Sequence, residues 1–155
     1  MVTYVIMLSH AYPANHERHG EPTYFKEKFV GTLGMRRKIH TIRANYALWR
    51  KRFEKIAAGE ACLSVREWLG APYRSKQREI ARLTCDDGIG VQMLRFHPDA
   101  DGVTGWQKLD IDGHCESSTH VANNDGLTFS DWKKWFRNYD LSKPLAIIHF
   151  TNFRY

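Results

Sequence analysis

The sequence RRKIHTIR begins at Arg36 and places a lysine and a threonine three positions apart among basic side chains. A threonine hydroxyl is a weak nucleophile, and it reacts only when a nearby base takes its proton. Lys38 can be that base if burial or cationic neighbours lower the pKa of its ammonium group, and Arg36, Arg37 and Arg43 are candidate neighbours. The segment therefore indicates a base and a nucleophile in Lys38 and Thr41, with a solvated basic turn as the alternative.

The spacing of Lys38 and Thr41 restricts where the two residues lie. The β-branched run 37–43 predicts a short strand, and side chains three apart in a regular strand point to opposite faces. The two side chains share one site only if Lys38 lies in the turn before the strand, or if a bulge separates them. The preceding sequence GMRR is compatible with such a turn.

Asp125 lies in the turn sequence NNDG. In such turns the aspartate carboxylate most often accepts hydrogen bonds from backbone amides. The alternative is a carboxylate held on a rigid turn between helical segments, where it orients an ammonium group or relays a proton. Both interpretations of Asp125 stay open at this point.

The histidines and cysteines do not follow the spacing of a metal site. His16 and His19 form one group, and His114, Cys115 and His120 form another, but neither matches a zinc pattern. The chain has no phosphate-binding glycine loop and no nucleophile elbow. We therefore expect no metal and no cofactor.

Length and composition are those of one ordinary domain, expected to span residues 1–155. Three cysteines at unrelated spacings predict no disulfide framework, as in a reducing cytoplasm. The apolar run YVIML is too short to cross a membrane or to form a signal-peptide core. We expect a soluble, cytoplasmic protein with no membrane partner, and a monomer is the favoured state.

Positive charge is concentrated in one part of the chain. The formal net charge is +6, but residues 36–82 carry thirteen Lys or Arg against four Asp or Glu, hence +9. The remaining residues carry ten against thirteen, hence −3. A basic face of this kind favours an anionic partner such as nucleic acid, and a solvated basic helix is the alternative.

Hydrophobic periodicity predicts a mixed order of helices and strands. We expect an α+β domain in which six or seven strands form a compact barrel, flanked by two or three helices. In the helix 45–59, Asn45 is the expected N-cap and Trp49 lies on the apolar face. The other predicted helices span 23–34 and 127–139, and the predicted strands span 3–12, 37–43, 61–70, 78–85, 89–96, 105–111 and 144–153.

Four aromatic side chains near basic residues are of the kind that stacks on nucleic-acid bases: Trp49, Trp68, Tyr73 and Trp106. Trp49 shares its helical face with apolar residues, so we expect it in the core. Trp68 and Tyr73 flank the turn sequence LGAP and are expected to be accessible. Arg74 and Lys76 follow directly and are candidate phosphate contacts.

The order of these features resembles the ASCH domain, a member of the PUA-like superfamily, over about residues 23–150. The most specific parts are KIHTIR, which begins at Lys38, and NDGLTF around Asp125 with its following aromatic helix. The segment LSVREWLGAPYRSKQREI is similar to longer, phage-like and bacterial members. The resemblance implies a small barrel whose cleft faces nucleosides or RNA.

The resemblance also implies a set of catalytic residues. In the compact bacterial members that act as acetylcytidine amidohydrolases, a lysine, a threonine three residues later and a distant glutamate form this set. Lys38 and Thr41 match the first two positions, and Asp125 stands at the third. The aspartate departs from the family pattern and is one methylene shorter, and this chain is longer than those enzymes.

Two functions follow as hypotheses. The first is hydrolysis of an amide on an acylated cytidine-like base, in which Lys38 is general base and acid and Asp125 orients it. Thr41 is then the nucleophile or a substrate-positioning hydroxyl, and Arg43 holds an oxyanion or phosphate. The second is a non-catalytic RNA-binding module, or an RNA-cleaving ASCH protein. The expected partner is a modified nucleoside or RNA, and the candidate binding residues are Arg37, His40, Arg43, Trp68, Tyr73, Arg74 and Lys76.

Overall fold

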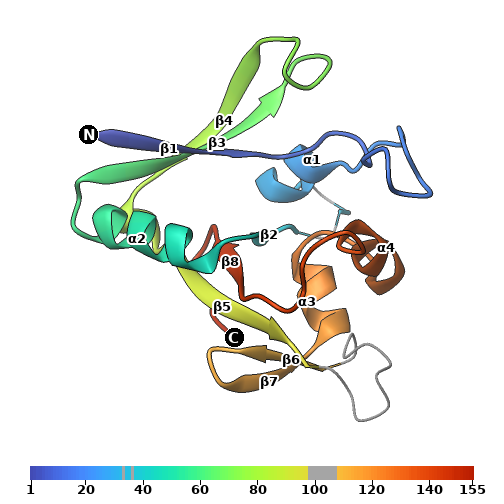
Figure 1. The fold of residues 1–155 in the computed structure, drawn as a ribbon. Helices are drawn as coiled ribbons and strands as arrows, with labels where there is room; N and C mark the ends of the chain where they lie inside the picture. The colour runs from blue at the N-terminus through green and yellow to red at the C-terminus, as the bar shows by residue number, and fades with distance from the viewer. Residues whose placement is uncertain (33, 36, 98–107) are drawn as a thin grey trace.

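The computed structural model describes residues 1–32, 34–35, 37–97 and 108–155, and these residues form an α+β fold (Figure 1). The described helices are α1 (Phe25–Val30), α2 (Tyr46–Ala57), α3 (Ser118–Asn124) and α4 (Phe129–Trp135), with a 3-10 turn, η1 (Cys85–Asp87). The described strands are β1 (Val2–Met7), β2 (His40–Arg43), β3 (Ala61–Trp68), β4 (Gln77–Leu83), β5 (Gly90–Phe96), β6 (Lys108–Ile111), β7 (His114–Ser117) and β8 (Leu145–His149). The expected α+β class is therefore confirmed.

The strands pair into two separate sheets. The three-stranded sheet has the order β1-β3-β4, with β1 parallel to β3, and the five-stranded sheet has the order β2-β8-β5-β6-β7. Hydrogen bonding among the described strands does not close into a ring, so the expected barrel is not found. After β4 the chain turns through η1 and enters the other sheet as β5.

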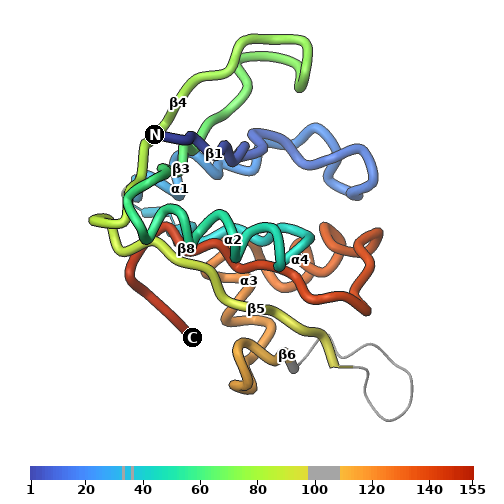
Figure 2. Tube along the Cα trace, turned by 60° about the vertical axis from the view of Figure 1, so that its left-hand side comes forward, coloured from blue at the N-terminus to red at the C-terminus, as the bar shows by residue number. Residues whose placement is uncertain are grey.

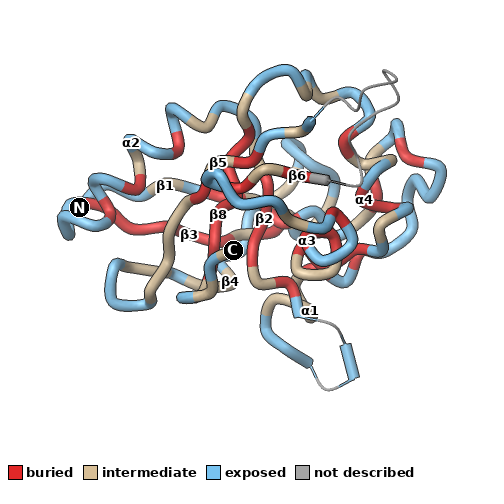
Figure 3. Tube along the Cα trace, turned by 90° about the horizontal axis from the view of Figure 1, so that it is seen from below, coloured by how far each residue is buried: buried red, intermediate tan, exposed pale blue. Residues whose placement is uncertain are grey.

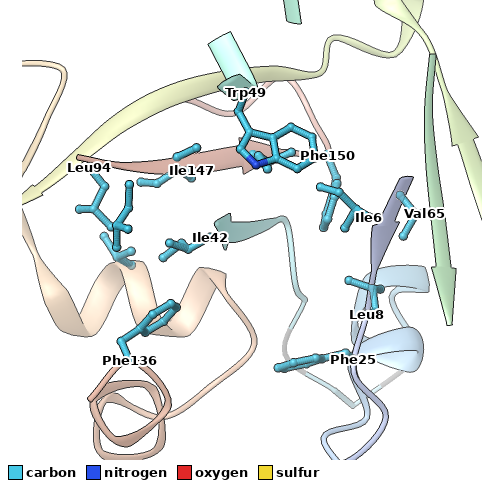
Figure 4. Close-up of a cluster of buried hydrophobic side chains, with 14 of the residues drawn as sticks. Ile6, Leu8, Phe25, Ile42, Trp49, Val65, Leu94, Phe136, Ile147 and Phe150 are labelled. Carbon is cyan, nitrogen blue, oxygen red and sulfur yellow. The ribbon is translucent and has the colours of Figure 1, made fainter. Parts of the chain in front are cut away.

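One core lies between the two sheets and their helices (Figure 4). Ile6 and Val65 come from the three-stranded sheet, and Ile42, Leu94 and Ile147 come from the five-stranded sheet. Each of these side chains is at most 1% exposed, and full burial of such a side chain contributes about 1.5–3 kcal/mol. The central strands β2 and β8 are buried along most of their length (Figure 3).

Helix α2 forms as its sequence predicts. Its N-cap is Asn45, whose side chain accepts a hydrogen bond from the Leu48 amide at 3.1 Å. Trp49, Phe53 and Ile56 form its buried face. The expectation that Trp49 belongs to the core is confirmed, since it is only 6% exposed.

Several predicted elements are shorter in the structure, and helix α3 and strand β7 were not predicted. The described residues form eight strands and four α-helices, one more of each than the largest number expected. Helix α1 ends at Val30 because Gly31 adopts φ 86° and caps it, whereas the sequence favoured a helix to Gly34. Strand β2 begins only at His40, and helix α4 covers seven of the thirteen residues predicted. Strand β7 escaped prediction because its residues are polar and largely exposed, without an alternating apolar pattern.

The loop between β1 and α1 is attached to helix α4. His16 Nε2 lies 3.1 Å from the backbone oxygen of Asp131, and Arg18 donates to the Asp131 carboxylate at 2.7 Å. Tyr12 donates to the same carboxylate at 3.4 Å. These contacts hold the segment that follows β1 in place, and they give His16 a structural role.

The hairpin of β3 and β4 extends beyond the rest of the fold (Figures 1 and 2). A bulge between Val65 and Arg66 shifts its register. The hairpin contacts the loop after β1, where the Leu8 amide donates to the Arg66 carbonyl at 2.8 Å and His10 Nε2 lies 3.3 Å from the Gly70 oxygen.

Within the described ranges, none of the helices combines the length and the apolar character that a membrane crossing needs.

Candidate functional site

Lys38 and Asp125 form a buried ion pair. Lys38 Nζ lies 2.5 Å from Asp125 Oδ1 and donates a second hydrogen bond to the Asp125 backbone oxygen at 2.8 Å. The two residues are 2% and 3% exposed. The second carboxylate oxygen of Asp125 accepts a hydrogen bond from Trp132 Nε1 at 3.1 Å. The carboxylate is therefore fixed from both sides, and it orients the lysine.

Asp125 lies on a turn between two helices, so the second interpretation of the NNDG sequence fits its position. Asp125 caps the C-terminus of α3, and Thr128 begins α4 by accepting a hydrogen bond from the Asp131 amide. Gly126 has φ 81°, and a Cβ at this position would lie 3.2 Å from Lys38 Cβ. The glycine thus allows the chain to turn and lets Lys38 approach closely.

Lys38 lies before strand β2, which is one of the two placements that allow a site shared with Thr41. The backbone amide of Lys38 donates to the Lys28 oxygen at 3.0 Å, and the Ile39 amide donates to the Asn124 oxygen at 2.9 Å. These bonds hold the extended segment between α1 and the α3 turn. Lys38 and Thr41 line the same cavity although they are three positions apart.

A cavity of about 130 Å³ joins the candidate catalytic residues. Four polar side chains that the sequence singled out contribute to its wall: Lys38, Thr41, Arg43 and Asp125. The remaining lining residues are mostly apolar or aromatic: Met7, Leu8, Ser9, Phe25, Ile42, Leu127, Trp135, Phe136 and Tyr139. A few polar groups on an apolar wall are typical of a small-molecule site.

Arg43 connects Thr41 to the loop after β1. Its guanidinium donates to Thr41 Oγ1 at 2.7 Å and to the backbone oxygens of Ile42 and Met7 at 2.9 and 2.7 Å. Since a guanidinium has only donors, Thr41 Oγ1 accepts this bond and its own proton is left to donate elsewhere. A cationic donor on the oxygen favours the deprotonated hydroxyl.

Burial controls the protonation of the Lys38–Asp125 pair. Desolvation lowers the pKa of Lys38 from its ordinary value of 10.5, and it outweighs the nearby Asp125 carboxylate, which acts in the opposite direction. Desolvation also raises the pKa of Asp125 from 3.8, against the effect of Lys38. Burial therefore has a larger effect on the pKa of Lys38 than the Asp125 carboxylate has. The shift moves the lysine toward a base.

The cations that further lower the pKa of Lys38 are Arg43 and Lys28. Of the three neighbours suggested by the sequence, only Arg43 is among them. Arg37 is exposed and donates to the Phe29 oxygen at 3.4 Å, and Arg36 lies outside the described residues. Lys28 was not predicted, because it comes from α1, and its Nζ donates to the Gly126 oxygen at 2.8 Å.

His40 lies behind the carboxylate of Asp125, and it does not line the cavity as the structure describes it. Its Nδ1 faces Asp125 Oδ1 at 3.8 Å, and its Nε2 lies 2.7 Å from the Tyr155 hydroxyl. That hydroxyl accepts from Asn124 Nδ2 at 3.0 Å, and its own proton is able to donate to His40 Nε2. We infer that His40 carries its proton on Nδ1, toward the carboxylate.

His149 pairs with His40 across strands β8 and β2 and has the opposite tautomer. Its Nε2 lies 2.9 Å from the Gln92 side-chain oxygen, which can only accept, so His149 carries its proton on Nε2. Neither Nδ1 has a hydrogen-bond partner among the described residues. Burial lowers the pKa of His149 to about 3 and that of His40 well below 6.5, so both rings are neutral.

Trp68 and Tyr73 line a second cavity of about 480 Å³. Their ring centroids lie 5.3 Å apart with an interplanar angle of 51°. Arg74 and Lys76 are exposed on the same hairpin turn but are not among the described residues that line either cavity. The structure therefore brings Lys38, Thr41, Arg43 and Asp125 together, and places the aromatic pair in the neighbouring cavity.

The described histidines and cysteines do not form a metal-binding cluster. Among the described residues, no group of three or more His, Cys, Asp or Glu side chains is placed to hold a metal ion. Cys62, Cys85 and Cys115 are free thiols. Trp106, considered above as a stacking residue, lies outside the described residues.

Several residues that support the site gave no functional signal in the sequence. Trp132 was expected only as part of an apolar helix face, yet its indole holds Asp125. The centre of the Phe25 ring lies 4.1 Å from Lys38 Nζ, and Tyr155 contacts His40 from 115 residues away.

Comparison with known proteins found no family model, no curated protein and no solved structure that matches this chain.

Proposed function

We propose that this protein hydrolyses an amide in which a small acyl group is attached to a cytosine-like base. The observation that carries this proposal is the buried Lys38–Asp125 pair, which opens onto one cavity together with Thr41 and Arg43. A base with a lowered pKa, a hydroxyl and a cation on one small cavity are the groups that acyl transfer needs. The resemblance to the ASCH domain, and with it a PUA-like fold, belongs to this proposal and supports the choice of base.

The reaction begins with neutral Lys38. Its amine removes the proton from the Thr41 hydroxyl, and the threonine oxygen attacks the carbonyl carbon of the substrate. The carbon–nitrogen bond then breaks as the Lys38 ammonium returns the proton to the amine of the base, which leaves. Water, activated by Lys38, hydrolyses the acyl-threonine to the free acid and restores the hydroxyl. Asp125 keeps the lysine pointed at these atoms throughout.

Arg43 supplies the positive charge for the tetrahedral intermediate. Its guanidinium already donates to Thr41 Oγ1 at 2.7 Å, so it is close to the place where the new carbon–oxygen bond forms. The carbonyl oxygen gains negative charge at this step, and a preorganised donor in a dry cavity stabilises it. The wall formed by Phe25 and Phe136 limits the access of water and strengthens this interaction.

A chromatographic assay of N4-acetylcytidine tests the proposal. The wild type is compared with Lys38→Met, and Lys133→Met is the matched control, because Lys133 is exposed on α4 and does not line the described cavities. Turnover by the wild type and the control, with a loss of about 10²- to 10⁴-fold in a folded Lys38→Met variant, supports the proposal. Equal turnover by all three proteins contradicts it.

RNA binding is a second candidate. One observation favours it: Tyr73 is 90% exposed on the hairpin turn and is followed by exposed Arg74 and Lys76. An exposed ring beside basic side chains is suited to a base and its phosphates. Affinity for a cytidine-containing RNA should then fall steeply as salt rises, because bound counterions are released. An affinity that is insensitive to salt argues against this role.

A further inference from the structure

We propose that the cavity of Trp68 and Tyr73 is the subsite for the planar ring of the substrate, and that the Lys38 cavity admits only a small acyl group. This inference rests on the proposed hydrolysis and adds a division of the substrate between two chambers. The aromatic subsite lies on the hairpin of β3 and β4, away from the catalytic residues in the chain.

The two cavities are neighbours. Both are lined by Met7, Leu8 and Ser9 of the segment after β1, and both are lined by Arg43. Arg43 donates to Thr41 in the first cavity and to the Met7 backbone in the shared wall. A molecule that reaches across this wall passes Arg43, so its carbonyl lies beside the guanidinium and its ring lies in the second cavity.

The volumes assign one part of the substrate to each cavity. The Lys38 cavity, at about 130 Å³, lies below the range of about 300–1,000 Å³ found for pockets that hold whole ligands, so it suits a small group such as acetyl better than a whole nucleobase. The second cavity, at about 480 Å³, lies in the range of about 300–1,000 Å³ found for pockets that hold whole ligands.

The walls of the second cavity suit a flat ring. Trp68 and Tyr73 present two aromatic rings at 5.3 Å, with Pro72 beside them. Tyr73 has φ 62°, a left-handed conformation that is uncommon for a bulky residue. It is held there by a closed turn, in which Ser75 Oγ donates to the Ala71 oxygen and accepts from the Gly70 amide. A strained, exposed ring kept in place is consistent with a binding role.

Calorimetric titration with cytidine tests the ring subsite without any hydrolysis. The variants are Trp68→Leu, which keeps an apolar side chain, and Tyr73→Asn, which removes the ring while asparagine accepts the left-handed backbone. Leu69→Asn is the matched control, since Leu69 is exposed on the same turn and is not a described lining residue of this cavity. We expect cytidine to bind roughly 5- to 150-fold more weakly to each ring variant, and unchanged to the control.

A series of acyl groups tests the small chamber. Acetyl-, propionyl- and benzoylcytidine differ only in the group that must enter the Lys38 cavity. We expect kcat/KM to fall with each increase in size, and benzoylcytidine to be the poorest substrate. In the ring variants, KM for acetylcytidine should rise while kcat changes little, because the ring lies away from the reacting bond.

The outcomes separate this inference from the proposed function. If the wild type hydrolyses acetylcytidine but Trp68→Leu and Tyr73→Asn bind cytidine as tightly as the wild type, the ring subsite is wrong and the hydrolysis stands. If cytidine binding depends on both rings but no acylcytidine is hydrolysed, the subsite stands and the proposed activity is wrong. A wild type that binds no cytidine overturns the subsite.

Discussion

The ammonium group of Lys38 lies 2.5 Å from the carboxylate of Asp125, 87 residues later in the chain, and both side chains are almost completely buried. Buried ion pairs cost free energy to desolvate and are weak evidence for stability alone. This pair opens onto a cavity with Thr41 and Arg43, and burial lowers the pKa of its lysine. The proposed hydrolysis gives this pair a chemical role in addition to any effect on folding.

Removing one partner of the pair should destabilise the protein more than removing both. In Lys38→Met the carboxylate of Asp125 loses its counter-ion in an apolar site, so we expect a loss of about 3–5 kcal/mol in the free energy of unfolding. The double variant Lys38→Met/Asp125→Asn should recover part of this loss. Urea unfolding of the two single variants and the double variant measures the coupling, and strictly additive losses would contradict it.

The pH dependence of hydrolysis should report the neutral form of Lys38. Because burial lowers the pKa of Lys38 below 10.5, kcat/KM should rise with pH and level off below that value. The Asp125 carboxylate raises the pKa of Lys38 through its charge and its hydrogen bond, so Asp125→Asn should move the rising limb to lower pH. A limb that moves to higher pH would contradict this assignment. NMR titration of the Lys38 side-chain nitrogen checks it independently of turnover.

Acid should destabilise the fold through its buried histidines. The pKa of His149 is about 3 in the folded protein and 6.5 ordinarily, so its contribution is complete above pH 6.5 and is lost as pH falls toward 3. In that window one such histidine lowers the free energy of unfolding by up to about 1.4 kcal/mol per pH unit. We expect His149→Gln to reduce the slope between pH 6 and pH 4 by up to this amount. Urea unfolding at several pH values measures it.

The control for that slope is His114→Gln, because His114 is exposed on strand β7. It should keep the wild-type dependence on pH. If His149→Gln and His114→Gln have the same slope as the wild type, the acid sensitivity comes from other groups, and the buried neutral state of His149 is not its source.

Tyr155 should fix the tautomer of His40. In the wild type, nitrogen-15 NMR of the imidazole rings should place the proton of His40 on Nδ1 and that of His149 on Nε2. Tyr155→Phe removes the hydroxyl that donates to His40 Nε2, so we expect a mixture of tautomers at His40 alone. A His40 ring that carries its proton on Nε2 in the wild type would show that the Tyr155 hydroxyl accepts from His40 instead of donating to it.

Local patterns in the sequence were sufficient for some of the elements around the site, but not for helix α3, whose C-cap is Asp125. The Asn45 cap and the apolar face of Trp49 predicted α2, and hydrophobic periodicity predicted a helix over 127–139, of which α4 covers seven residues. For Lys38, side-chain alternation left two placements that allow a site shared with Thr41, before the strand or next to a bulge, and the structure has the first. The cap and the apolar face of α2 depend on residues within a few positions of each other, so the sequence alone determines them.

The remaining features of the site depend on the tertiary structure. Strand pairing put the described strands into two sheets instead of a barrel, and it brought Asp125 to Lys38 from far along the chain. The direction of the lysine pKa shift depended on burial, which is a property of the whole fold. Lys28, a cation that also lowers the pKa of Lys38, lies on α1, and Tyr155, the last described residue, contacts His40. Such contacts depend on packing between distant segments, and no local spacing encodes them.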